Sequence, residues 1–288
     1  MRLEEFIRQY NLVGVRKNST FLFNWLYNVY TKTYLPCIDI IYKESLAINK
    51  TKLTIFDVLI DDLSDNYKVR NKRVLELFMQ IPWNRRKKYK NRYLEFGRMV
   101  WNSCINSIKK YPRFKEFKDI FYFDLRQVLN SMEYSFLVNT YGISNYIEDK
   151  IYLPHGCMVI LHCDMDLMCS RNFDIKELRD MRVIFHLAQK VAHIGNMLNT
   201  YPKEILEKDL SSPIISLAIR KNIIDEELNL NDLQKIKNLE ILFKNKVELY
   251  LEKIKKYENK IKSVNIKDFS NKLEKLFNAF INRKHYWE

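Results

Sequence analysis

The sequence predicts an all-α fold in a single domain. Its 288 residues include only 5 Gly and 6 Pro, whereas all-β sandwiches and barrels need many turns of the kind that these residues form. Apolar residues recur at intervals of three and four along most of the chain, which is the period of an amphipathic helix. No Gly/Ser-rich linker interrupts this pattern. We therefore expect one domain over residues 1–288, built as an α-helical bundle with a sizeable core.

In the first half of the chain, proline and glycine separate the expected helices. Residues 1–50 have apolar positions at helical spacing, and Pro36 interrupts them before the next helix. Pro82 and Pro112 follow two further helical segments, and Gly142 is placed to cap a third. These three segments cover residues 74–79, 96–108 and 122–141.

The second half of the chain also predicts helices. The apolar segment 158–168 suits a buried helix. Asp174 is a candidate N-cap for a helix that runs straight into Asn196. The Ser-Ser-Pro sequence at 211–213 ends that pattern, and residues 226–262 have the mixture of apolar and charged positions that amphipathic helices show.

Composition narrows the setting in which the protein works. The net charge of +14 favours an acidic partner such as nucleic acid, an anionic membrane surface or a polyphosphate substrate. No stretch of about 18 apolar residues is present, so we expect no membrane span. The 5 Cys form no CxxC pair and are odd in number, which argues against a disulfide scaffold and favours a cytoplasmic protein. The 18 Tyr and 17 Phe are numerous enough to line an apolar cavity as well as a core.

Four carboxylates interrupt the apolar run at residues 56–66. Asp57, Asp61 and Asp65 are spaced four apart, so a helix stacks them on one face, with Asp62 about 100° round the same turn. Like charges on a core-facing helix are destabilising unless cations neutralise them. Carboxylate oxygens are the ligands that hard divalent ions prefer, so the stripe predicts a magnesium site.

A second set of oxygen ligands lies far down the chain. Asn196, Thr200 and Glu204 are again four residues apart, so one helical face presents an amide oxygen, a hydroxyl and a carboxylate. Pro202 lies within this segment, where it removes one helical hydrogen bond. A kink between Thr200 and Glu204 would move the carboxylate away from the other two ligands.

Together the two segments resemble a known family. The Asp-Asp-Leu-Ser-Asp run at 61–65 looks like the aspartate-rich motif of class I terpene synthases. Asn196, Thr200 and Glu204 are similar in spacing to that family's second metal motif. The resemblance, to the bacterial type with a single α domain, implies helices around a central apolar cavity that is capped by two metal-binding helices. It also implies a lyase that uses three Mg²⁺ ions to ionise a prenyl diphosphate, releases diphosphate and cyclises the carbocation to a terpene.

The resemblance assigns roles to individual residues. The catalytic positions of the first motif are Asp61, Asp62 and Asp65. The implied metal ligands are Asp61, Asp65, Asn196, Thr200 and Glu204. The implied diphosphate-binding residues are Lys150, Arg283 and Tyr286. Lys150 stands where the family usually has an arginine, and a lysine donates to phosphate as a point charge without the arginine fork.

An aromatic lining is expected for the cavity. Aromatic faces stabilise carbocations as they do other cations, and a dry cavity keeps water from quenching them. The candidates for this lining are Phe21, Trp25, Phe56, Phe78, Tyr134 and Tyr201. The substrate would be farnesyl or geranylgeranyl diphosphate, a shorter linear diphosphate, or an already cyclised diterpenyl diphosphate, and the sequence does not select among them.

Three rival functions are open to this sequence. A chain-elongating prenyltransferase shares the helical fold and the first motif, but it carries a second Asp-Asp-x-x-Asp motif, for which Asp164 and Asp166 are the nearest cluster here. A basic helical nucleic-acid-binding protein would use the cluster from Arg85 to Lys90, but it gives no reason for the two ligand stripes. A related scaffold that has lost catalysis is the third. We favour the cyclase, expect no stable nucleic-acid partner, and leave a homodimer open.

Overall fold

The computed structural model describes residues 2–283, and every regular element within them is a helix. The predicted all-α class is therefore confirmed. The α-helices are α1 (Leu3–Val13), α2 (Ser19–Tyr30), α3 (Lys43–Ser64), α4 (Lys72–Met79), α5 (Arg92–Ile108), α6 (Phe114–Tyr141), α7 (Tyr146–Tyr152), α8 (Val159–Met168), α9 (Leu178–Glu207), α10 (Pro213–Arg220), α11 (Asp232–Lys237), α12 (Glu240–Lys255) and α13 (Ile266–Ile281). Short 3₁₀ turns precede three of them: η1 (Ile40–Tyr42), η2 (Leu153–Cys157) and η3 (Ile175–Glu177).

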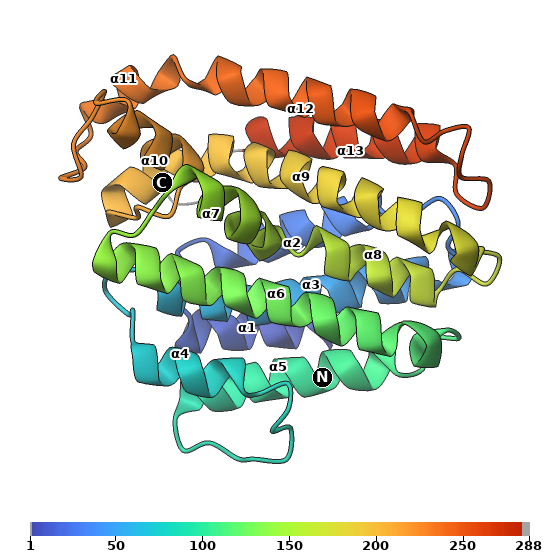
Figure 1. The fold of residues 1–288 in the computed structure, drawn as a ribbon. Helices are drawn as coiled ribbons and strands as arrows, with labels where there is room; N and C mark the ends of the chain where they lie inside the picture. Colours follow the sequence, from blue (N-terminus) through green and yellow to red (C-terminus); the bar gives the residue numbers. More distant parts are fainter. Residues whose placement is uncertain (1, 284–288) are drawn as a thin grey trace.

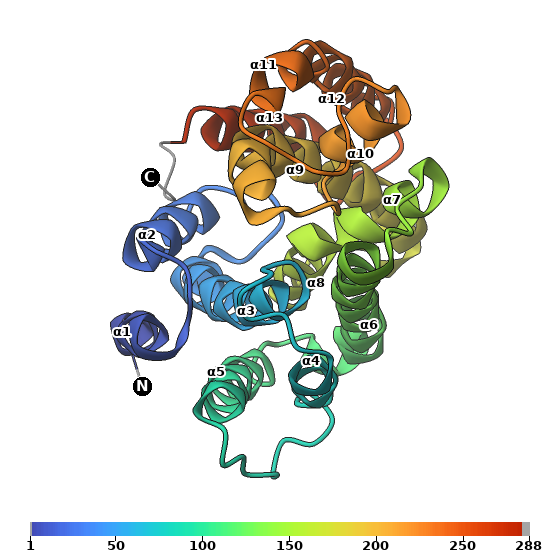
Figure 2. The same ribbon diagram turned by 90° about the vertical axis from the view of Figure 1, so that its left-hand side faces the viewer.

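The long helices run roughly along one direction, so they lie side by side in Figure 1 and are seen nearly end-on in Figure 2. In the end-on view α3 lies inside a ring formed by α1, α2, α4, α5, α6 and α8. The other long central helix, α9, packs against α8 and is covered on its outer side by α12 and α13. The bundle is thus organised around two inner helices, α3 and α9.

The helix α3 is buried on all sides over most of its length, and every residue from 49 to 60 is buried. A helix with polar residues can occupy such a position only where those residues find partners or a cavity. Lys50 finds one, because its ammonium nitrogen lies 2.7 Å from a carboxylate oxygen of Asp166 on α8. Asn49 finds another in the Tyr111 hydroxyl, at 2.8 Å. The aspartates further along α3 have to be accounted for in the same way.

Local signals fix several helix ends as the sequence predicts. Gly142 follows α6 with a left-handed φ of +66°, a conformation that glycine adopts without a Cβ penalty. Asp174 accepts a hydrogen bond from the backbone N–H of Lys176, so it caps the turn that leads into α9. That helix continues through Pro202 to Glu207.

One large apolar core connects most of the helices, with buried side chains from α1 at one end of the chain to α13 at the other, although α7 contributes none. All five cysteines are free thiols. No helix within residues 2–283 is long and apolar enough to span a bilayer.

Candidate functional site

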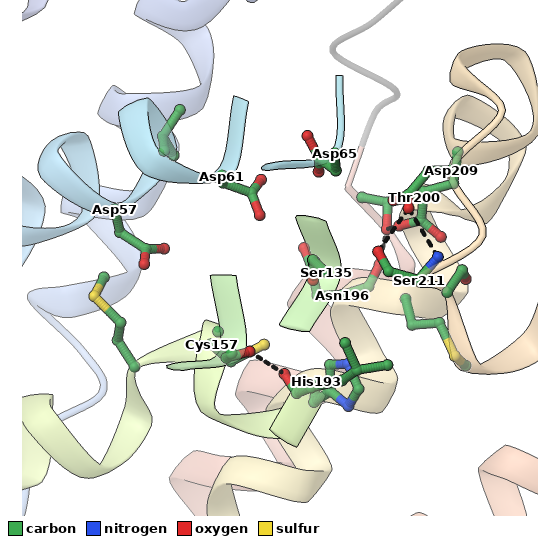
Figure 3. A pocket seen from close by; sticks show the side chains of 18 of the residues that line it. Asp57, Asp61, Asp65, Ser135, Cys157, His193, Asn196, Thr200, Asp209 and Ser211 are labelled. Atoms are coloured by element: carbon green, nitrogen blue, oxygen red, sulfur yellow. Dashed lines mark hydrogen bonds between the residues drawn. The ribbon is translucent and has the colours of Figure 1, made fainter. Parts of the chain in front are cut away.

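A cavity of about 190 Å³ lies between α3 and α9, with further walls from α2, α6, η2 and α13. Figure 3 looks into it. Asp57 and Asp61 reach it from α3, and Asp65 from the C-cap position that follows this helix, whereas Asn196 and Thr200 reach it from α9 on another side. The two predicted ligand stripes therefore line one cavity, although they are far apart in the sequence.

On the α3 side, two of the three stacked carboxylates have a buried oxygen without a partner. Oδ1 of Asp57 and Oδ1 of Asp65 receive no hydrogen bond from any residue that the structure describes. Asp61 differs, because it forms an ion pair with the Arg16 guanidinium. A buried carboxylate oxygen that nothing satisfies is costly, so these two oxygens are suited to accept a cation.

Asp62 does not line the cavity. Its Oδ2 accepts a 2.9 Å hydrogen bond from the Tyr10 hydroxyl, and its Oδ1 accepts one of 2.7 Å from Nε of Arg16. The side chain is only 1% exposed. Asp62, which the resemblance gives as a catalytic position of the first motif, holds Arg16 instead, and Arg16 itself lines the cavity beside Asp61.

On α9 the spacing of four produces the expected stripe. Asn196, Thr200 and Glu204 all line the cavity. Because α9 remains one helix through Pro202, the proline does not separate Glu204 from the other two side chains. The Thr200 hydroxyl is hydrogen-bonded to the Glu204 carboxylate one turn later.

The acids in the cavity repel one another. Burial, followed by the charge of Asp61, raises the pKa of Asp57 and the pKa of Asp65 well above the usual range. Burial, followed by the charge of Asp209, raises the pKa of Glu204 to about 7. Asp209 also raises the pKa of Asp65, which couples the loop after α9 to the end of α3. A cation bound among these groups would remove the repulsion.

Three charged residues of the cavity were not identified from the sequence: Arg16, Lys203 and Asp209. Arg16 and Asp209 lie in loops, where no repeating pattern marks them. Asp209 accepts hydrogen bonds from Ser211 and from Asn139, the latter at 2.8 Å. Only Lys203 carried a signal, because it immediately precedes the predicted ligand at 204 on the same helix.

The predicted diphosphate-binding residues have different outcomes. Arg283 lines the cavity and donates hydrogen bonds of 2.8 and 3.1 Å to the side chain of Asn199. Tyr286 lies outside the residues that the structure describes. Lys150 is on α7, with its nitrogen 3.4 Å from the centroid of the Tyr146 ring, and it lines a different pocket. It does not reach the cavity because α7 packs against α10 and η2.

None of the six aromatic candidates lines this cavity. These residues are Phe21, Trp25, Phe56, Phe78, Tyr134 and Tyr201. Phe56 and Phe78 pack on each other in the core, with ring centroids 5.0 Å apart. The Tyr134 and Tyr201 hydroxyls donate to Asp149 and Glu240 instead. Phe21 is 43% exposed, and Trp25 packs on Phe280 and Arg283. Helical spacing shows which residues share a face but not what that face meets.

The donor set at the cavity fits a hard divalent cation. It combines unpartnered carboxylate oxygens of Asp57 and Asp65 with the amide of Asn196 and the hydroxyl of Thr200. Within residues 2–283 no three His, Cys, Asp or Glu side chains form a ready-made metal group. Protein sites for Mg²⁺ commonly use one or two carboxylates and complete the shell with water and substrate phosphate. No protein-family model and no curated protein matches this chain.

Proposed function

We propose that the protein is a Mg²⁺-dependent class I terpene synthase, which ionises a prenyl diphosphate and cyclises the resulting carbocation. The observation that carries this proposal is the meeting of two oxygen-ligand faces, from α3 and α9, at one cavity. The order and spacing of the two motifs, which resemble those of that family, add to it. A solvated acidic helix face would not account for carboxylates buried beside an apolar wall.

Magnesium bound here would stabilise the negative charge of the departing diphosphate. The residues that would hold it are Asp57, Asp61, Asp65, Asn196, Thr200 and Glu204. Arg16, Lys203 and Arg283 line the same cavity and would place positive charge where the diphosphate leaves. Because these cations and acids are already in position, little reorganisation is needed when the carbon–oxygen bond breaks.

The remaining wall of the cavity is suited to a hydrocarbon chain. Leu26, Val58 and Met132 contribute apolar surface, and Tyr30 and Phe280 contribute aromatic rings. Apolar side chains exclude water that would quench a carbocation, and aromatic faces stabilise the cation itself. The aromatic residues that serve this purpose are therefore not the ones expected from the sequence.

The size of the cavity bears on the substrate. Its volume of about 190 Å³ lies below the range of about 300–1,000 Å³ that is usual for ligand pockets. A small adjacent cavity of about 70 Å³ shares Leu26, Tyr30, Cys157 and Phe280 with the candidate site, so these side chains form the wall between the two. A ten-carbon geranyl chain requires the least rearrangement, whereas a farnesyl or geranylgeranyl chain requires the two cavities to merge.

The structure gives little support to the chain-elongating prenyltransferase or to the nucleic-acid-binding protein. The chain-elongating prenyltransferase would use Asp164 and Asp166 as part of its second motif, but neither lines the cavity, and Asp166 pairs with Lys50. For the nucleic-acid-binding protein, Arg85 of the basic cluster binds side chains of its own fold, including Asn102 at 3.0 Å.

The test is a product assay. The purified protein is incubated with geranyl, farnesyl and geranylgeranyl diphosphates, with and without Mg²⁺, and products are read by gas chromatography and mass spectrometry. We expect a Mg²⁺-dependent terpene from at least one substrate and none from Asp61→Ala, while Glu274→Gln, an exposed change on α13, retains activity. Retained turnover in Asp61→Ala would refute the site. A parallel incubation adds isopentenyl diphosphate, the five-carbon co-substrate that chain elongation consumes, and a longer prenyl product there would identify the elongating rival.

A further inference from the structure

A second pocket, of about 290 Å³, lies between α7, α9, α10 and α12. These four helices meet at the upper right of Figure 2. Each helix contributes at least one positively charged side chain to the pocket wall. The five cations are Lys150, Lys190, Arg220, Lys246 and Lys253.

Little negative charge compensates these cations. Among the described residues, Asp149 is the one acid that lines the pocket. It is buried and accepts hydrogen bonds of 2.8 Å from the hydroxyls of Tyr134 and Ser216. Within residues 2–283 none of the five cations forms an ion pair with an acid. The pocket therefore holds a concentration of positive charge that its own residues do not neutralise.

Aromatic rings stand beside the cations instead. The Tyr146 ring has Nζ of Lys150 3.4 Å from its centroid and Cζ of Arg220 at 4.5 Å. Lys150, followed by the nearby charges of Lys246 and Arg220, lowers the pKa of the Tyr146 hydroxyl. Burial, and then the charges of Lys150 and Arg220, lower the pKa of Lys246. The cations are close enough to repel one another, and a bound anion would relieve that repulsion.

The pocket also has apolar walls, from Pro154, Ile194, Leu217, Phe243 and Tyr250. Lysines that are merely solvated would not explain why cations from four helices converge on one apolar concave surface. Lysine and arginine pair strongly with phosphate oxygens, and aromatic or aliphatic walls hold the rest of a ligand. We propose that this pocket binds an organic phosphate, in which a di- or triphosphate is joined to an aromatic or apolar group.

This site is separate from the candidate magnesium site. His193 and Pro213 line both cavities and form part of the wall between them. Burial lowers the pKa of His193 to about 4, so the imidazole is neutral at pH 7 and contributes no charge to either side. The acids of the first cavity suit a cation, whereas the second pocket suits an anion without metal.

The test is calorimetric titration of the full chain in EDTA, which removes Mg²⁺ and so isolates this site from the proposed catalytic one. The probes are ATP, geranyl diphosphate and inorganic diphosphate. The variant Lys246→Ala/Lys253→Ala is compared with Lys255→Ala/Lys256→Ala, which changes two exposed lysines at the end of α12 and has the same net charge. Thermal melts of both variants verify folding. Should the first variant unfold, Lys150→Gln on exposed α7 replaces it under the same criteria.

We expect ATP or geranyl diphosphate to bind the wild-type protein. The dissociation constant should rise by about tenfold or more in the first variant and by less than about twofold in the control. The tighter of the two organic probes identifies a nucleotide or an isoprenyl ligand. Equal weakening in both variants, or no binding to wild type, would overturn the proposal. Inorganic diphosphate that binds as tightly as both organic probes would overturn the organic class.

Discussion

Asp61 and Asp62 are neighbours on α3 that both pair with Arg16, yet only Asp61 lines the cavity. The side chain of Asp62 points to the Tyr10 hydroxyl, so its second oxygen is already satisfied by the fold. Two adjacent acids of one motif therefore do different things: one faces the site, and the other positions the arginine beside it.

Asp62→Asn should destabilise the protein. Arg16 keeps its ion pair with Asp61 but loses the charge-assisted hydrogen bond to Asp62, and such a bond contributes about 1.5–3 kcal/mol. Urea unfolding of the Mg²⁺-free protein measures this cost. Unchanged stability would show that the pair with Asp62 does not hold Arg16.

Asp65→Asn should change the free energy of unfolding in the opposite direction in the same experiment. Its Oδ1 is buried without a partner, and burial raises its pKa well above the usual range. Replacing that carboxylate by a neutral amide should stabilise the Mg²⁺-free protein by about 1–3 kcal/mol. It should also abolish Mg²⁺-dependent turnover. A destabilised Asp65→Asn protein would contradict the view that this acid is held in the site for a cation.

The free energy of unfolding should depend on pH through Glu204. The pKa of this group is about 7 in the folded protein and 4.5 ordinarily, so between these values only the folded state keeps the proton. The stability of the Mg²⁺-free protein should therefore fall as pH rises from 4.5 to 7, by roughly 3 kcal/mol from this group. Glu204→Gln should remove that part of the decline, whereas Glu274→Gln should not. Identical pH profiles for wild type and Glu204→Gln would refute the assignment.

Leu26→Ala should change the preferred chain length. Leu26 lines both the candidate active site and the 70 Å³ cavity beside it, so its truncation should join the two. We expect kcat/KM to rise for farnesyl relative to geranyl diphosphate, with a loss of stability of about 2–5 kcal/mol. Leu12→Ala, an exposed change on α1, serves as the control. An unchanged ratio would show that the hydrocarbon chain does not pass this wall.

The sequence predicted those parts of the site that depend on helical periodicity. The spacing of four stacks Asp57 with Asp61 and Asn196 with Thr200 whatever the rest of the fold does, because it follows from 3.6 residues per turn. Likewise, the scarcity of glycine and proline predicted the all-α class.

What periodicity could not give is the environment of each face. Arg16 and Asp209 reach the cavity from loops, whose path depends on tertiary packing. The aromatic lining was misplaced for a related reason. Phe56 lies about 100° round α3 from Asp57 and packs in the core on Phe78, and sequence spacing does not show which side of a helix meets a cavity. Lys150 was assigned by counting along the chain, and the packing of α7 against α10 placed it in another pocket.

The most direct test of the central claim is calorimetric titration of Mg²⁺ into the protein in the presence of inorganic diphosphate. The claim is that α3 and α9 hold the metal jointly, so Asp61→Asn and Glu204→Gln, on opposite sides of the cavity, should each weaken Mg²⁺ binding by about tenfold or more. Glu274→Gln should bind as wild type does. Mg²⁺ binding that is unaffected by either cavity variant, or that depends on only one of the two helices, would contradict the account.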